Sequence, residues 1–437
     1  MTGPATAELP VTSAPAAGGD AGLPRLLAGP PASPDPRQAL ADHLRTHGRL
    51  PQDPDPAALT SQIAVAGLTG RGGAAFPSDR KIAAVRAVAG NAVVVGNGAE
   101  GEPASRKDAA LLWHAPHLVL DGLQLAAAAA GAQTALLCVH GGRTGLRVHL
   151  EKALSVRTDT VTVRLVETPP RFLAGEESAL ISHLNGGAGM PAFKGRRVSE
   201  RGVGGRPTLV QNVETLAHIA LIARRGARWF RAAGTSDEPG SLLCTVTDAD
   251  GSVRIVETAA GTPLARLLHL HDGVQAVLAG GYHGGWLSVA QASTLRLSNT
   301  DLKPAGTFVG AGVLAALPAA RCGLAETAGV VRYLALESAG QCGPCLNGLP
   351  RIAAALAAIA RPRPARVELG SLVRWAGLLP GRGACHHPDG TARLVASALR
   401  VFAAEIGDHA RGRCTAGTTA PFLPIPAAGA ARPTGGS

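Results

Sequence analysis

Residues 91–108 read NAVVVGNGAEGEPASRKD, and this stretch decides the fold. Its first five residues, Asn91 to Val95, have the short, Val-rich pattern of a buried β-strand. The polar turn GNGAEGEP follows at once, and a helix is predicted from Asp108 to Gly131. In a parallel sheet covered by helices, ligands bind at the carboxyl ends of the strands. The turn at 96–103 is therefore a candidate binding site.

The same alternation continues along the chain. Strands are predicted over 134–139 and 160–166, with a helix over 146–155 between them. Short apolar strands alternating with helices predict an α/β fold with a parallel, helix-covered sheet. Short β-like segments over 240–298 then predict a small α+β module. Helical patterns from Ala325 onward predict a terminal helical bundle.

Composition narrows the class of protein. The chain has 437 residues, of which 46% are hydrophobic, as in globular proteins. Its net charge is +11, but no Arg-rich run is interleaved with aromatic residues, which argues against nucleic-acid binding. The most apolar stretch, 122–142, is too rich in Ala, Gly and Gln to span a membrane. No signal peptide is evident, so we expect a cytoplasmic protein.

A glycine-rich loop precedes the first strand and reads GLTGRGGAAFPSDRK over Gly67–Lys81. Glycines let a backbone approach a ligand closely and aim its N–H groups at a phosphate. Arg71 and Lys81 add positive charge. The loop matches neither a Walker A loop nor the GxGxxG dinucleotide fingerprint. It is typical either of a phosphate-binding loop or of a plain surface turn.

Three further turns contain polar side chains. Asn97, Glu100 and Glu102 lie in GNGAEGEP, where they suit hydrogen bonding to sugar hydroxyls or, alternatively, capping of the next helix. RFLAGEESALISHLNG over 171–186 places two Glu at the start of a helix, which fits a ligand-facing turn or the helix dipole. PTLVQNVETLAHI over 207–219 adds a Gln-Asn turn before another helix.

The seven cysteines argue against a disulfide framework, because their number is odd and no export signal is evident. ESAGQCGPCLNG over 337–348 contains Cys342 and Cys345, and Cys385 follows later. Such a set can hold zinc or an iron–sulfur cluster. A thioredoxin-like pair would instead follow an early strand. The other cysteines lie in predicted strands or lack paired spacing: Cys138, Cys244, Cys322 and Cys414.

Together and in this order, the motifs resemble the NADH-binding flavoprotein (FMN/iron–sulfur) subunit family of respiratory complex I and of NAD-linked hydrogenases and formate dehydrogenases. In that family the corresponding segments read GRGGAGFP, NADEGEP, CGEETAL, PTLINNVET and ESCGQCxPC. The resemblance covers about 59–407 of this chain. It implies a Rossmann-like FMN domain, a ubiquitin-like (β-grasp) module and a helical bundle with a [4Fe-4S] cluster. The expected divisions are a flexible arm 1–36, the FMN/NADH domain 37–235, the β-grasp module 240–300, the iron–sulfur bundle 320–413 and a flexible tail 414–437.

The resemblance also implies which residues hold the cofactors. Asn97 and Glu100 would face the flavin, Glu102 the nicotinamide nucleotide, and Phe76 the NADH adenine. No protein acid or base is needed, because the flavin performs the hydride chemistry. The residues expected around FMN and NADH are Gly70, Arg71, Gly72, Gly73, Phe76, Lys81, Asn97, Glu100, Glu102, Gly175, Glu176, Glu177 and Asn212. The expected cluster ligands are Cys342, Cys345 and Cys385.

Several positions depart from the family pattern around the nucleotides. Ala99 replaces an Asp, Phe172 a Tyr, Gln211 the first Asn of a pair and Ala84 an aromatic residue. The chain thereby loses a charged acceptor, a hydroxyl donor and a stacking ring. We therefore expect NADH binding to be weaker than in the family, and FMN binding to be better retained.

Another departure affects the cluster, since Ala339 stands where the family has its first cysteine. Three thiolates can hold a [3Fe-4S] cluster, or a [4Fe-4S] cluster whose fourth iron takes another ligand. His386 and His387 are candidates for that ligand. A zinc site with three Cys and one His is also chemically possible.

The resemblance implies an enzyme that passes electrons from NADH through FMN to the cluster. A ferredoxin-like or thioredoxin-fold iron–sulfur protein, or a quinone-linked partner, would accept them, and the chain could lie peripherally on a membrane complex. Two alternatives stay open. The chain could be a catalytically degenerate scaffold for electron carriers, or an FMN/iron–sulfur enzyme with a donor other than NADH.

Overall fold

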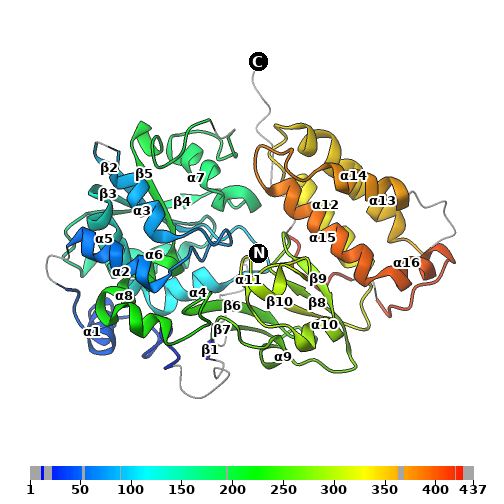
Figure 1. The fold of residues 1–437 in the computed structure, drawn as a ribbon, viewed down its shortest axis with the longest axis horizontal. Helices are drawn as coiled ribbons and strands as arrows, with labels where there is room; N and C mark the ends of the chain where they lie inside the picture. The colour runs from blue at the N-terminus through cyan, green and yellow to red at the C-terminus, as the bar shows by residue number, and fades with distance from the viewer. Residues whose placement is uncertain are drawn as a thin grey trace.

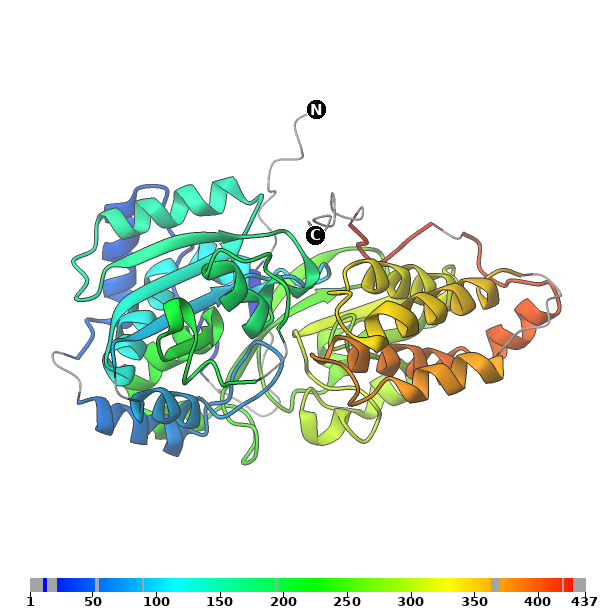
Figure 2. The ribbon, with the colours of Figure 1, turned by 90° about the horizontal axis from the view of Figure 1, so that it is seen from above.

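The computed structural model describes residues 11–13, 22–51, 55–88, 90–192, 195–362, 369–418 and 420–426. Three folded parts lie side by side (Figure 1): an α/β part in blue to green, a second sheet in yellow-green and a group of helices in yellow to orange. Seen from above, the helices of the first part lie on either side of its sheet (Figure 2).

Four parallel strands form the first sheet, in the order β4-β3-β2-β5. They are β2 (Ala92–Gly98), β3 (Ala132–His140), β4 (Val163–Thr168) and β5 (Thr208–Asn212). Val93 and Val95 pack in one hydrophobic cluster and Val94 in another. Successive side chains of a strand point to opposite faces, so both faces of the sheet are buried, which explains the continuous apolar run. The predicted parallel, helix-covered α/β fold is confirmed.

The helices of this part are α1 (Pro36–His47), α2 (Pro56–Ala66), α3 (Ser78–Arg86), α4 (Lys107–His114), α5 (Pro116–Ala130), α6 (Thr144–Ser155), α7 (Glu177–Leu184) and α8 (Val213–Arg231), with short 3₁₀ turns at Phe172–Gly175 and Val203–Gly205. The single helix predicted over 108–131 is two helices, α4 and α5. The chain leaves the helical conformation at Ala115 (φ −135°, ψ 56°) because the following Pro116 disfavours it there.

The amino-terminal segment is not a loose arm where the structure describes it. β1 (Val11–Ser13) pairs in parallel with β7. Residues 25–27 donate their backbone N–H groups to the buried Glu257 carboxylate, and Leu26 is fully buried. The prediction of a flexible arm over 1–36 is therefore wrong for these residues, because a buried acceptor and an apolar side chain fix them. Residues 1–10 and 14–21 lie outside the described residues.

The second sheet has the order β1-β7-β6-β10-β8-β9. Its other strands are β6 (Ser241–Thr247), β7 (Val253–Ala259), β8 (Val274–Ala279), β9 (Gly285–Ser288) and β10 (Val313–Pro318), with the short helices α9 (Leu264–Leu267), α10 (Val289–Thr294) and α11 (Asn299–Leu302). β10 lies between β6 and β8. The predicted end of this module at residue 300 is therefore too early, since it leaves out an interior strand.

The carboxyl-terminal helices are α12 (Gly323–Leu336), a π turn (Pro344–Gly348), α13 (Leu349–Ile359), α14 (Leu369–Leu378), α15 (His387–Val401) and α16 (Ala403–Ala410). They share one hydrophobic cluster, which includes Leu334, Leu356 and Val395. The predicted tail over 414–437 is packed at its start: Glu326 accepts the N–H groups of Phe422 and Leu423, and Leu423 is buried. Within the described residues, no helix is long and apolar enough to cross a membrane.

Candidate functional site

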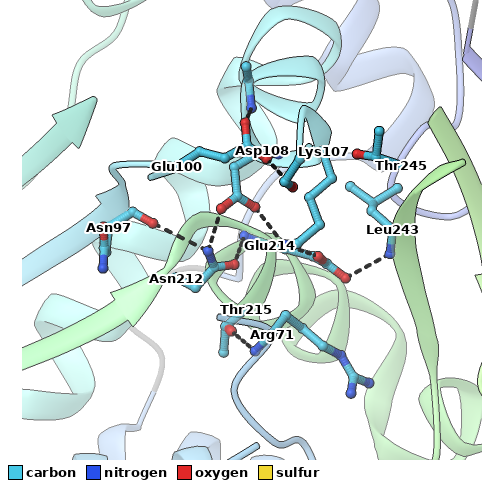
Figure 3. Close-up of polar contacts among 12 residues, drawn as sticks. Arg71, Asn97, Glu100, Lys107, Asp108, Asn212, Glu214, Thr215, Leu243 and Thr245 are labelled. Carbon is cyan, nitrogen blue, oxygen red and sulfur yellow. Dashed lines mark hydrogen bonds and ion pairs between the residues drawn. The ribbon is translucent and has the colours of Figure 1, made fainter. Parts of the chain in front are cut away.

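The carboxyl ends of β2 and β5 bring two of the predicted residues together. Asn97 and Asn212 are paired in the register of these strands. The Asn97 side chain donates to the carbonyl of Gly175 at 2.9 Å. Asn212 caps α8, and its Nδ2 donates to Asp108 Oδ2 at 2.7 Å (Figure 3). The register of β2 and β5 thus places these two asparagines side by side at the carboxyl end of the sheet. We call this end the polar edge.

An ion-pair network at this edge escaped the sequence analysis. Lys107 Nζ lies 2.7 Å from Asp108 Oδ1 and 2.8 Å from Glu214 Oε2 (Figure 3). We call these three residues the Lys107 network; none of their side chains is more than 8% exposed. Burial alone would lower the pKa of Lys107, but the two carboxylates raise it above its usual value. Glu214 also accepts the N–H of Leu243, so the network joins α8 to the second sheet.

Arg71 lies in the glycine loop beside this network. Its backbone N–H donates to Thr215 Oγ1 at 2.9 Å, and its Nη2 donates to the Pro239 carbonyl at 3.0 Å. Its Nε is buried and has no hydrogen-bond partner, and Arg71 forms no ion pair within the described part of the chain. Burial lowers the pKa of Arg71. A guanidinium in this setting suits an anionic ligand.

The glycine loop contains one residue in an unfavourable backbone conformation. Ala75 has φ +51°, a left-handed conformation in which other described residues of positive φ are all glycine. The family motif GRGGAGFP has glycine at this position, so the sequence contained a signal for this strain that went unused. The loop abuts the polar edge, since a Cβ added at Gly72 would lie 3.4 Å from Asn212 Cβ. Phe76, next in the loop, is 49% exposed.

The predicted Gly-Glu-Glu turn has local partners for both of its carboxylates. Glu176 is the N-cap of α7 and accepts the backbone N–H groups of Ser178 and Ala179. Glu177 Oε1 lies 2.6 Å from Lys81 Nζ, which also donates to the Val210 carbonyl. Both residues of this ion pair are part-exposed, and they join α7 to α3.

The acidic turn (96–103) and the turn that contains Phe172 and Gly175 are packed closely against each other. A Cβ added at Gly101 would lie 2.2 Å from the carbonyl oxygen of Phe172, and one added at Gly175 would lie 2.4 Å from that of Ala99. Real Cβ atoms do not approach backbone so closely. Glycine is therefore required at both positions, and the acidic turn and the Gly-Glu-Glu turn are fixed against each other.

The two glutamates of the acidic turn point into the protein. Glu100 accepts from Ser105 Oγ at 2.6 Å and from the N–H of Asp108 at 3.1 Å. Glu102 accepts the N–H of Tyr282 at 2.9 Å, which joins this turn to the second sheet. Burial raises the pKa of Glu102 to about 7. The predicted contacts of Glu100 with flavin and of Glu102 with nicotinamide stay predictions.

Phe172 connects the α/β part to the bundle. Its backbone N–H donates to Glu337 Oε2 at 3.0 Å, and Glu337 begins the motif ESAGQCGPC. Its ring meets His283 and Tyr333 edge-on, at centroid distances of 4.8 and 6.0 Å. The residue that replaces the family's Tyr therefore lies at the joint between the two parts.

The predicted cluster ligands come together in the bundle. We call Cys342, Cys345 and Cys385 the thiol triplet; Cys345 and Cys385 are buried and Cys342 is part-exposed. Burial, together with the neighbouring thiols, raises the pKa of Cys345 to about 12, while a hydrogen bond from the Gly340 N–H opposes that rise. Adjacent thiolates repel one another, so a cationic metal centre is needed to hold them ionised.

The two histidines after Cys385 differ in whether their ring nitrogens are free to bind the cluster. His387 is buried; its Nε2 lies 2.8 Å from the Leu334 carbonyl and its Nδ1 lies 3.0 Å from His283 Nε2. Both ring nitrogens of His387 are engaged, so it is not available as a fourth cluster ligand in this arrangement. His386 is exposed and pairs through Nδ1 with Asp389.

Comparison with known proteins finds a matching domain model for each of the two sites. Residues 63–221 match the Nuo51 FMN-binding domain, and residues 325–409 match the NADH-ubiquinone oxidoreductase-F iron-sulfur binding region. An NADH-quinone oxidoreductase subunit of Salmonella typhimurium is 28% identical over 375 residues, covering 80% of this chain and 84% of the relative. An NADH-quinone oxidoreductase subunit of Rhizobium meliloti is 27% identical over 379 residues, covering 82% and 90%.

Solved structures agree with this assignment. The NAD⁺-reducing [NiFe]-hydrogenase in its H₂-reduced state superimposes with a TM-score of 0.74 at 29% identity over 84% of this chain. This chain spans 64% of the length of that hydrogenase chain. The expected FMN and iron–sulfur cofactors and the oxidoreductase class are confirmed at the level of the family. This chain therefore matches an FMN-binding domain and an iron–sulfur binding region of NADH dehydrogenases, and it is similar over most of its length to NADH-quinone oxidoreductase subunits.

Proposed function

We propose that this chain oxidises NADH at an FMN held at the carboxyl edge of β2 and β5, and delivers the electrons to a cluster held by the thiol triplet. One observation carries the proposal. The turn at 171–175 contacts both sites: the carbonyl of Gly175 accepts from Asn97, and the N–H of Phe172 donates to Glu337 of the cluster motif. A single short turn thus spans from the flavin side to the cluster side.

Unsatisfied polar atoms support FMN binding. Arg71 Nε and Gln211 Nε2 are buried without partners among the described residues, and buried polar groups ordinarily have them. Bound FMN supplies hydride acceptance and the release of single electrons, while the protein supplies position and charge. We assign phosphate and ring contacts to the glycine loop and the polar edge: Gly70, Arg71, Gly72, Gly73, Lys81, Asn97, Glu100, Gly175, Glu176, Glu177 and Asn212.

The NADH site is proposed to be weaker than in the family. Phe76 is the exposed aromatic ring available for stacking on adenine, whereas Ala84 offers none. Base stacking on an aromatic ring contributes about 1–3 kcal/mol, so the loss of one ring predicts a clearly higher Kd. Glu102 is assigned to the nicotinamide side, although its carboxylate is partly committed to Tyr282.

The cluster is proposed to be a [3Fe-4S] cluster with an open corner. Ala339 cannot ligate iron, His387 is engaged through both nitrogens, and His386 is paired with Asp389. Backbone N–H groups such as that of Gly340 help to hold an anionic cluster.

The finer architecture is also a proposal. β6 and β10 are parallel neighbours at the centre of the second sheet, flanked by β7 and β8, and this order supports a β-grasp module. The related proteins are subunits of larger oxidoreductases, and the net charge of +11 favours an acidic partner. We therefore propose a ferredoxin-like or thioredoxin-fold iron–sulfur protein as the electron acceptor.

A specific observation favours a second function, that of a non-catalytic scaffold. In the Lys107 network a lysine of the chain itself pairs with both buried carboxylates, so the α/β part can keep its shape without a ligand. Together with Ala339, this allows a protein that retains the family fold without turning over NADH.

Arg71→Glu tests the flavin assignment. The new carboxylate would face the flavin phosphate at a partly buried site, at a cost of several kcal/mol, so the purified variant should contain no flavin. Arg266→Glu makes the same charge change at an exposed site and should retain it. Flavin content is read by fluorescence after denaturation, and circular dichroism checks the fold. Full flavin content in a folded Arg71→Glu variant would refute the assignment.

A further inference from the structure

Four ligand groups meet at the amino-terminal end of α12. Cys322 immediately precedes that helix, Glu405 and His409 lie one turn apart on α16, and Cys414 follows α16. Their ligand atoms all lie within 4.8 Å of one another. We call these residues the α12 tetrad. Neither FMN nor the thiol triplet uses any of them, and the two cysteines lack a paired spacing in the sequence.

Two of the spacings in the tetrad are close to those around a single metal ion. Cys322 Sγ lies 3.7 Å from His409 Nε2, and that nitrogen lies 3.8 Å from Glu405 Oε1. Zinc–ligand bonds of about 2.0–2.3 Å in a tetrahedron place the ligand atoms about 3.3–3.8 Å apart. The two distances therefore already match a tetrahedral zinc ion.

No lysine or arginine of the described chain forms an ion pair with the tetrad. The side chain of Glu405 is 6% exposed, and apart from the neighbouring Cys322 thiol its carboxylate oxygens have no hydrogen-bond donor within the described chain. The nearby Arg411 and Arg413 pair with Asp408 instead. A buried carboxylate without a strong donor or a counter-ion is costly, and a bound cation removes that cost.

The histidine is oriented for ligation. His409 Nδ1 lies 3.1 Å from the carbonyl oxygen of Ile359, which can only accept a hydrogen bond. Nδ1 therefore bears a proton, and Nε2 is the nitrogen that faces Cys322 and Glu405 and can ligate a metal in the neutral imidazole. A backbone carbonyl that fixes the tautomer of a ligating histidine is a common feature of zinc sites.

We propose that the α12 tetrad binds one structural Zn²⁺ through Cys322, Glu405, His409 and Cys414. Mixed sulfur, nitrogen and oxygen donors in a tetrahedron suit zinc, and four protein ligands leave no open position for catalysis. Binding releases the thiol protons of the two cysteines to solvent. The ion ties α16 and the segment after it to the start of α12. That helix has 14 residues, so the thiol triplet beyond its other end is separated from the zinc by about 21 Å of helix.

Metal analysis of the full chain, purified anaerobically, tests this site. We expect about one zinc per chain in the wild type and less than about a tenth in Cys322→Ser and His409→Ala, with iron and flavin unchanged. Cys244→Ser, at a buried thiol of β6, is the matched control and should keep its zinc. Cys345→Ser should show the reverse pattern, losing iron and retaining zinc. Zinc that persists in Cys322→Ser, or disappears only in Cys345→Ser, would overturn the proposal.

Cobalt binding keeps the test valid if a variant folds poorly. Co²⁺ added to chelator-treated wild-type chain should give thiolate charge-transfer absorption and the visible bands of a tetrahedral site. The charge-transfer band should weaken in Cys414→Ser, a part-exposed position that tolerates substitution better than the buried ligands. A wild type with neither zinc nor a cobalt spectrum, or with a Cys322–Cys414 disulfide detected by mass spectrometry, would overturn the assignment.

Discussion

The flavin side and the helical bundle neutralise their buried charges in different ways. At the polar edge of the first sheet, the Lys107 network places a cation between two carboxylates. In the bundle, both the thiol triplet and the α12 tetrad gather groups that are neutral or anionic, and no Lys or Arg pairs with Glu405 in the described chain. The first region therefore pairs its buried charges with its own side chains, whereas our proposals assign that role in the second region to bound metal.

Lys107→Met should have the largest effect on stability, and it tests whether the Lys107 network holds the α/β part together. It leaves Asp108 and Glu214 buried without a cation, which costs about 3–5 kcal/mol. Hydrogen exchange of the β2 and β3 amides should accelerate accordingly, and metal content in the bundle should not change. Lys303→Met, at an exposed lysine, is the control. A loss below about 1 kcal/mol would show that the α/β part does not depend on this network.

Ala339→Cys sharpens the comparison at the cluster. The new thiol stands where the family has its first cluster ligand, so the fourth iron gains a site. Iron should rise from about three to about four per chain, and the paramagnetic signal of an oxidised three-iron cluster should disappear. Zinc in the α12 tetrad serves as the internal control. A wild type that already holds four irons would contradict the open corner.

Glu102→Gln tests a smaller effect, which is the pH dependence of folding stability. It arises where Glu102 joins the acidic turn to the second sheet. The pKa of Glu102 rises from 4.5 to about 7 in the folded chain, so the folded state binds this proton more tightly than the unfolded state. Its contribution to stability is therefore complete below pH 4.5 and is lost as the pH rises through about 7. The variant has no such proton, so its stability should fall less between about pH 5 and pH 8.

Urea unfolding at several pH values measures this difference. Glu200→Gln, an exposed site on the same part of the chain, should follow the wild type. Parallel pH profiles for Glu102→Gln and the wild type would show that the Glu102 carboxylate does not titrate in this range.

The sequence predicted what depends on local pattern. The apolar run at Asn91 to Val95 revealed a buried parallel strand, and that strand places Asn97 at the polar edge. Composition misled at both ends of the chain: residues rich in Pro, Ala and Gly suggested flexibility, yet Leu26 and Leu423 are buried. A few apolar residues with buried acceptors are enough to order such segments.

Sites built across long separations could not be predicted. Lys107 and Glu214 are 107 residues apart, and Cys322 and His409 are 87 residues apart. Neither pair has a spacing that a motif could reveal, because the fold alone brings them together. The thiol triplet was predictable because two of its members lie within four consecutive residues of a recognisable motif.

The visible spectrum of the anaerobically purified chain, before and after NADH, tests the central claim most directly. We expect flavin bands with a broad thiolate-to-iron shoulder, followed by bleaching of the flavin that requires more NADH than is usual for the family. Full bleaching shows that electrons pass from NADH to the bound flavin. A colourless protein, or a flavin that does not bleach at millimolar NADH, would contradict the proposed NADH oxidation and favour the scaffold or a different electron donor.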